Sequence, residues 1–236
     1  AEDGIRDFCL SRGLGDVYKR QPRKYLEFRL FWPYSSGLAG QWMSHQIDTV
    51  HWFSGLKNPR SVVANGGIYM WKDGRKNWDT VTAVFDYGPS NDSNTGFQVS
   101  FASRMHNGDE RPAEIYYSNG GEMNLNTNKV SPTGGLRENF AKAMGMNANL
   151  LPDKDLNVVD QKVITSANTG NDPLTSGHMR NWMESVRDRK EPNAPVEAGY
   201  SHAIACIMVN AAVQTGLKAT FDEKTQEVMA LSLIHI

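Results

Sequence analysis

Alternation of apolar and polar residues predicts a series of short β-strands in the first half of the chain. Residues 80–87 alternate strictly, a period typical of a strand with one buried face. The segments predicted as strands are 25–32, 61–64, 67–71, 80–87, 97–103, 114–118 and 122–125. Residues 119–121, Asn-Gly-Gly, predict a hairpin between the last two, because Asn and Gly tolerate positive φ.

Helical spacing dominates the rest of the chain. A helix is predicted over 38–53, where Trp42, Met43, Ile47 and Val50 form one apolar stripe. Further helices are predicted over 136–144, from Thr175 or Ser176 to about 189, and over 197–214, with Gly55 and Gly216 as helix ends. A strand over 158–164 is a further prediction. The order predicts an α+β fold, a mostly antiparallel open sheet with helices packed on one face.

Composition narrows the class of protein. The 236 residues, 39% hydrophobic and 22% charged, suit one large globular domain or two small ones. With 25 basic and 26 acidic side chains, charge favours neither nucleic acid nor an anionic membrane as partner. We see no apolar run near the ~18 residues that span a bilayer, so no membrane segment is expected. Two cysteines exclude a disulfide scaffold, and the cellular compartment stays open.

The two ends differ from the middle. Residues 1–21 and 231–236 resemble translated sequencing-adapter sequence, the alternative being a natural basic arm and a terminal strand. We therefore expect residues 22–230 to be the genuine domain. Residues 13–15, Gly-Leu-Gly, are not a dinucleotide fingerprint, because no strand precedes them and no third glycine follows in register.

Candidate chemistry gathers on the first predicted helix. His45 and Asp48 are three residues apart, so they lie near each other and suit an acid–base pair. The alternative is a surface hydrogen bond without catalytic role. His45, Asp48 and His51 spread over an arc of about 120°, so one metal ion does not reach all three and no metal site is predicted.

Aromatic residues before that helix suggest a sugar-binding surface. Arg29, Trp32 and Tyr34 offer a planar donor and two aromatic faces, which suit a sugar or polyol ring; packing within the sheet is the alternative reading. His202 is expected to be a packed or interface residue.

Three segments together resemble one family. Residues 37–48, Gly-Leu-Ala-Gly-Gln-Trp-Met-Ser-His-Gln-Ile-Asp, are similar to the first helix of the C-terminal domain of Gfo/Idh/MocA oxidoreductases. Residues 61–69 and 189–199 resemble later segments of the same domain, in the same order. The resemblance implies NAD(P)-dependent oxidation or reduction of a sugar, inositol or glycoside hydroxyl by a protein of which this chain is the substrate domain.

The resemblance also assigns roles. It implies that His45 is the acid–base residue and that Asp48 supports it, while Gln41 stands where the family has a first acid. With Trp42, Gln41 joins Arg29, Trp32 and Tyr34 as the expected substrate-binding set. NAD or NADP is the expected cofactor of the intact protein, but not one that this chain binds tightly, because the family's Rossmann domain is expected to be missing.

The expected partners are a small carbohydrate or polyol, the Rossmann domain, and further copies of the chain. We expect a homo-oligomer through the sheet, because an open sheet face would otherwise expose a large apolar patch. A non-catalytic carbohydrate-binding or scaffold domain is the alternative function. A metal-dependent lyase or hydrolase is a third, which requires a bound metal.

Overall fold

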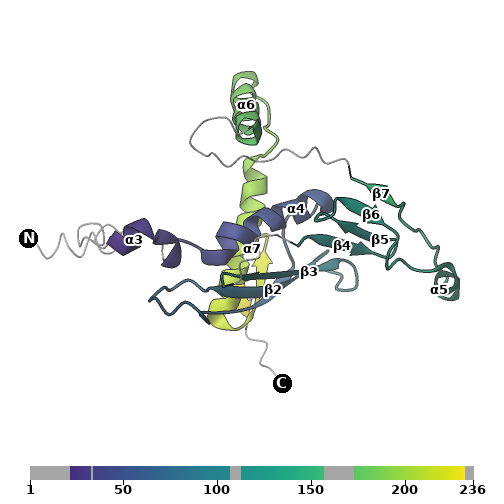
Figure 1. The fold of residues 1–236 in the computed structure, drawn as a ribbon, viewed down its shortest axis with the longest axis horizontal. Helices are drawn as coiled ribbons and strands as arrows, with labels where there is room; N and C mark the ends of the chain where they lie inside the picture. The colour runs from purple at the N-terminus through teal and green to yellow at the C-terminus, as the bar shows by residue number, and fades with distance from the viewer. Residues whose placement is uncertain (1–21, 33, 107–112, 157–172, 232–236) are drawn as a thin grey trace, which may run out of the picture. The chain divides into compact units, whose positions relative to one another are not determined.

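The computed structural model describes residues 22–32, 34–106, 113–156 and 173–231 (Figure 1). The chain forms two compact units. The first combines residues 1–108 with 194–236, and the second comprises residues 109–193. The second unit is therefore inserted in the sequence of the first.

A five-stranded antiparallel sheet organises the first unit, in the order β3-β2-β1-β8-β9. Its strands are β1 Ser61–Gly67, β2 Thr80–Tyr87, β3 Phe97–Arg104, β8 Lys218–Asp222 and β9 Glu227–Leu231. The central strand β1 pairs with β2 along its full length, and Ser61 and Val62 pair with β8 on the other side. Strands from both ends of the sequence therefore meet at β1.

Two helices cover one face of this sheet. Helix α7, Val196–Thr215, contacts β1, β8 and β9, and α4, Ser44–Ser54, packs against α7 (Figure 1). The π-helical turn η2, Ala39–Met43, leads directly into α4. Residues that meet between the helices and the sheet form the core: Met43, Ile47, Val62, Val81, Phe85, Met208 and Val209. The predicted α+β class and antiparallel pairing are confirmed.

The other face of the sheet carries short and mostly polar side chains. Strand β2 alternates, so Val81 and Phe85 are buried while Thr82 is exposed. Asn65 lies opposite Thr82 in β1, and Val63, 50% exposed, is the main apolar group of that strand on this face. The expected large apolar patch is therefore absent from the described part of this face.

A second, four-stranded sheet belongs to the other unit, so the chain has two sheets where we expected one. Its order is β4-β5-β6-β7, all antiparallel. The elements of this unit are β4 Ile115–Ser118, β5 Gly121–Asn124, β6 Lys129–Ser131, α5 Glu138–Ala143, β7 Lys154–Asp155 and α6 Pro173–Asp188. The predicted hairpin at residues 119–121 is confirmed, with Gly121 at φ 139°.

The predicted strand over 25–32 is wrong. The segment forms two short helices, α3 Pro22–Leu26 and η1 Phe28–Leu30. Among its large apolar side chains Phe31 alone is buried, and no strand pairs with it. The Leu30 carbonyl instead accepts the N–H groups of Lys76 and Asn77, which fixes the segment against a loop.

Other boundaries also differ from prediction. The strand predicted over 67–71 does not form, because the N–H groups of residues 69–71 bond to a carboxylate. Strands β6, β7, β8 and β9 were not predicted, and β9 includes Leu231, a residue of the predicted adapter-like tail. The predicted strand over 158–164 and the segments 1–21 and 232–236 lie outside the described residues. Gly55 and Gly216 end their helices as predicted, at φ 68° and 69°.

Helix α7 departs from the expectation of no membrane segment. By length and composition alone it is apolar enough to cross a bilayer. Its apolar residues are used in the core, since Ile204, Met208 and Val209 are buried against the sheet and α4. Packing within the first unit accounts for its composition.

Candidate functional site

The π-helical turn before α4 is anchored to α7. The Cys206 thiol donates to the Ala39 carbonyl at 3.2 Å, and Asn210 Nδ2 donates to the Ser36 carbonyl at 3.1 Å. Gly40 fits because a Cβ there would collide with Ser36 Oγ. These contacts fix where α4 begins and therefore which of its residues face outward.

Gln41 helps to fix the segment that precedes η2. Its Nε2 donates to Ser35 Oγ at 2.8 Å and to the Arg29 carbonyl at 3.4 Å. The same carbonyl accepts Asn77 Nδ2 at 2.6 Å. The amide N–H groups of Gln41 thus hold the loop before η2, and its carbonyl oxygen remains for a ligand.

One face of η2 and α4 is open to solvent and carries the predicted chemistry. Trp42 is 51% exposed and Trp52 80% exposed, with exposed His45 and Asp48 between them in sequence. Within the described residues the His45 ring makes no hydrogen bond or ion pair, so both ring nitrogens are accessible. We call Trp42, His45, Asp48 and Trp52 the helix face.

Asp48 faces a different histidine from the one we predicted. Its Oδ1 lies 3.5 Å from Nδ1 of His202 on α7, whereas no contact joins it to His45 in the described part of the chain. The structure therefore shows an Asp48–His202 pair. Sequence spacing could not find this pair, because it joins two helices far apart in the chain.

His51 lies on the opposite, buried side of α4. Its Nε2 is 2.9 Å from the Tyr87 hydroxyl, and the two rings meet edge to face. Burial lowers the pKa of His51 to about 4; Asp48 raises this pKa and His202 lowers it further. Burial also raises the pKa of Tyr87. His51 is thus a neutral core residue. The sequence held one indication of its partner, because Tyr87 occupies an inward position in the alternating segment 80–87.

The remaining predicted residues divide between packing and surface. Trp32 packs edge to face on Trp78, with ring centres 5.5 Å apart; neither residue lies in a strand, so this is packing outside the sheet. The Arg29 guanidinium lies over the Phe28 ring at 5.4 Å, and Tyr34 is half-buried. No described contact joins the Arg29 or Trp32 side chain to His45.

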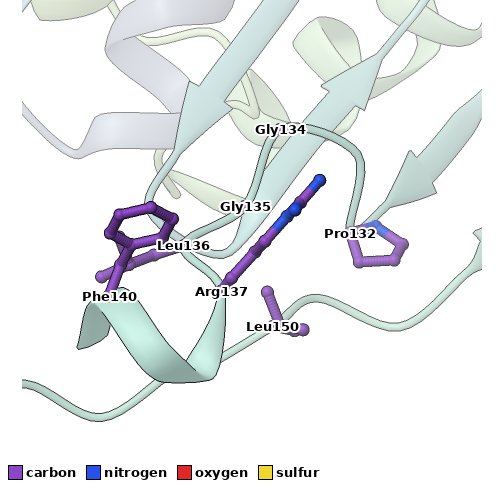
Figure 2. Close-up of a pocket in the computed structure, with 7 residues that line it drawn as sticks. All are labelled: Pro132, Gly134, Gly135, Leu136, Arg137, Phe140 and Leu150. Atoms are coloured by element: carbon purple, nitrogen blue, oxygen red, sulfur yellow. The ribbon is translucent and has the colours of Figure 1, made fainter. Parts of the chain in front are cut away.

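The second unit contains an open pocket that shares no residue with these predictions. It has a volume of about 490 Å³ and is lined by Pro132, Gly134, Gly135, Leu136, Arg137, Phe140 and Leu150. Figure 2 shows the Arg137 side chain extended between Pro132 on one side and Leu136 and Phe140 on the other. The lining offers one cation among apolar groups and no acid–base pair or nucleophile.

Two further kinds of site, for a metal ion and for a dinucleotide, are not found in the described residues. Within them, no group of three His, Cys, Asp or Glu side chains is arranged to hold a metal ion. Every strand pair in both sheets is antiparallel, and none leads through a glycine-rich turn into a helix as a Rossmann dinucleotide site requires. The part of the chain that the structure describes therefore contains no Rossmann-type site for NAD or NADP.

Comparison with known proteins adds no relative, because no family model matches the chain and no curated protein matches it.

Proposed function

We propose that this chain is the substrate-binding half of an NAD(P)-dependent oxidoreductase that acts on a sugar, inositol or glycoside hydroxyl, as the C-terminal domain of Gfo/Idh/MocA proteins does. The observation that carries the proposal is the helix face, where an unpartnered His45 lies between two exposed tryptophans. The order of the three resembling segments supports it, as does an antiparallel sheet covered on one face by helices.

In this proposal, a ring nitrogen of His45 accepts or returns the proton of the substrate hydroxyl. Histidine suits this task because it changes charge near neutral pH. Exposed Trp42 and Trp52 supply apolar faces for the C–H side of a sugar ring. Asp48 supplies negative charge one turn further along α4 and links the face to His202 on α7.

We assign to this chain only the substrate side of the reaction, because the described residues contain no Rossmann-type dinucleotide site. The purified chain is therefore expected to show no turnover of any sugar with NAD or NADP. A nucleotide-binding domain belonging to the same protein or assembly would supply the redox chemistry.

A non-catalytic carbohydrate-binding domain is the second candidate. Two observations favour it: Gln41 has no charge with which to stabilise a protonated His45, and Asp48 contacts His202 instead of His45. In this alternative the helix face binds a sugar and transfers no proton.

His45→Ala distinguishes the two candidates. In the full-length protein we expect kcat to fall about 100-fold, since a general acid–base group contributes at least that much, and Asp48→Asn to cost less. The control Lys57→Ala, beyond the end of α4, should keep kcat. Unchanged kcat in His45→Ala contradicts a catalytic role.

Sugar binding by the chain alone is a separate test. Six tryptophans give six indole NMR signals, assigned by single Trp→Phe variants. A neutral sugar or polyol should shift the signals of Trp42 and Trp52 and leave that of Trp78, which packs against Trp32. If no neutral sugar shifts Trp42 or Trp52, both candidates fail.

We also propose that copies of the chain associate through the open face of the five-stranded sheet. The short side chains of β1 and β2 on this face permit close packing of a second sheet. Val63→Arg, in the central strand, is expected to shift the parent's dimer to monomer in sedimentation experiments, because it places a charge in that interface. The control Val196→Arg adds the same charge at the exposed start of α7. A monomeric parent contradicts the proposal.

A further inference from the structure

Three successive large side chains are exposed in the loop after β1, beginning two residues beyond its end. Tyr69 is 63% exposed, Met70 56% and Trp71 41%. Their backbone is nevertheless fixed, because their three N–H groups donate to the carboxylate of buried Asp79 at 2.9–3.0 Å. A rigid loop that holds large side chains in solvent is typical of a binding surface.

The Tyr69 ring lies at the end of the open sheet face. A Cβ built on Gly67 would meet this ring, so the hydroxyl end of the Tyr69 ring lies over Gly67. Gly67 is opposite Thr80 in β2, and Thr80 is opposite Arg104 in β3. Residues opposite each other in adjacent strands share a face, so Tyr69 and Arg104 lie on the same side of the sheet.

Two further contacts extend this surface to Trp71. Thr80 Oγ1 lies 3.5 Å from Nδ1 of exposed His106. Trp71 Nε1 donates to the Met105 carbonyl at 2.9 Å, between Arg104 and His106 in sequence. We call Tyr69, Trp71, Arg104 and His106 the aromatic rim.

Basic side chains outnumber acidic ones in the loop that carries the rim. Residues 68–79 contain Lys72, Arg75 and Lys76 against Asp73 and the buried Asp79. Asp73 is bound by Arg75 at 2.9 Å and by Arg23 at 3.0 Å. The Arg75 guanidinium also lies 5.6 Å from the centre of the Trp71 ring. Exposed Arg104 forms no ion pair within the described residues, so its planar donors are available to a carboxylate.

We propose that the aromatic rim binds an acidic oligosaccharide. Aromatic rings beside guanidinium groups match a chain of sugar rings that carries carboxylates, because the rings pack on C–H faces and arginine pairs with the acid. A nucleic acid fits less well: tracking its backbone takes many phosphate contacts, whereas the rim offers few cations and the whole chain has net charge −1.

This proposal is independent of the function proposed above. The rim contains none of the helix-face residues. Val63 lies four residues from Gly67 along β1, about 13 Å away, so the rim is at the end of the open face and not at its centre.

Calorimetric titration of the full chain with oligogalacturonate, at low salt, tests the proposal. Its fully methyl-esterified form has the same sugar chain without charge and is expected to bind at least about 10-fold more weakly. Trp71→Ala and Tyr69→Ala should each weaken binding about 10-fold, and Arg104→Gln about 5-fold, with a smaller dependence on salt. Trp182→Ala removes an equally large ring, 55% exposed on α6 and part of neither proposed site, and should change nothing.

Thermal melts of the variants separate binding from folding. Trp71→Ala loses the bond to Met105, whereas the exposed Tyr69 and Arg104 side chains donate no described hydrogen bond, so those two variants should melt as the parent does. Equal affinity for the acidic and esterified chains, no binding at about 1 mM, or tighter binding of oligothymidylate would each overturn the proposal. So would full affinity in Tyr69→Ala and Arg104→Gln.

Discussion

Replacing Asp79 with alanine is expected to lower the free energy of unfolding by about 4 kcal/mol. The Asp79 side chain is fully buried, and its carboxylate accepts the N–H groups of Tyr69, Met70 and Trp71 together with the Thr80 hydroxyl. Alanine leaves all four donors without this acceptor. Urea denaturation followed by tryptophan fluorescence measures the change.

Asp79 also makes the free energy of unfolding depend on pH. Burial alone raises its pKa, but the four donors together lower it to about 2, below the ordinary value of 3.8. The stabilisation is therefore complete above about pH 4 and is lost as the pH falls towards 2, because the unfolded chain takes up the proton first. Asp79→Ala should lack this part of the acid dependence.

Asp92→Ala is the matched control for Asp79. Asp92 is only partly buried, and its carboxylate accepts the Asn94 N–H and the Thr95 hydroxyl in a turn, so its loss should cost less than about 1 kcal/mol. An equally small loss in Asp79→Ala would contradict the role we give to the buried carboxylate.

The second large effect is a loss of stability in mild acid that depends on His51. The pKa of His51 is about 4 in the folded chain, against an ordinary value of 6.5, chiefly because the ring is buried. Above about pH 6.5 the ring is neutral in both states and stability is complete. Between pH 6.5 and 4 only the unfolded chain takes up the proton, so the free energy of unfolding falls by about 3 kcal/mol.

His51→Gln should remove this pH dependence, measured as the difference from the parent in urea denaturation at about pH 7 and about pH 4. Tyr87→Phe keeps the ring buried and removes only the hydroxyl that His51 contacts at 2.9 Å. Because burial is the main cause, this variant should keep most of the dependence. If it loses the dependence, the hydrogen bond and not burial holds the ring neutral.

The spacing of apolar residues predicted the elements that bury one face and did not predict those that do not. Residues 80–87 alternate strictly and form β2, and the 38–53 stripe forms η2 and α4. Residues 25–32 also alternate, yet both of their faces carry apolar side chains, so the pattern could not tell a strand from short helices. Strands β8 and β9 are five residues each, and β1, the other partner of β8, lies far away in the sequence.

The candidate functional site on α4 was predictable only in part, because some of its contacts join elements that are far apart in the sequence. The positions of His45 and Asp48 on one exposed helix face follow from helical spacing. The Asp48–His202 and His51–Tyr87 contacts depend on how α7 and β2 pack against α4, which no local spacing encodes. The carboxylate of Asp79 overrides the strand pattern of 67–71, so the exposed aromatic loop could not be foreseen either.

The pairing of β1 with β8 has a consequence for how the protein is made. A ribosome produces β1, β2 and β3 early, but the second edge of β1 gains its partner only when Thr220 and its neighbours emerge. Until then a nascent chain holds an unpaired central strand, which other strands can join. Pulse-labelled nascent chains should therefore remain protease-sensitive in the first unit through most of their synthesis. The C-terminal hairpin β8–β9 completes the sheet last.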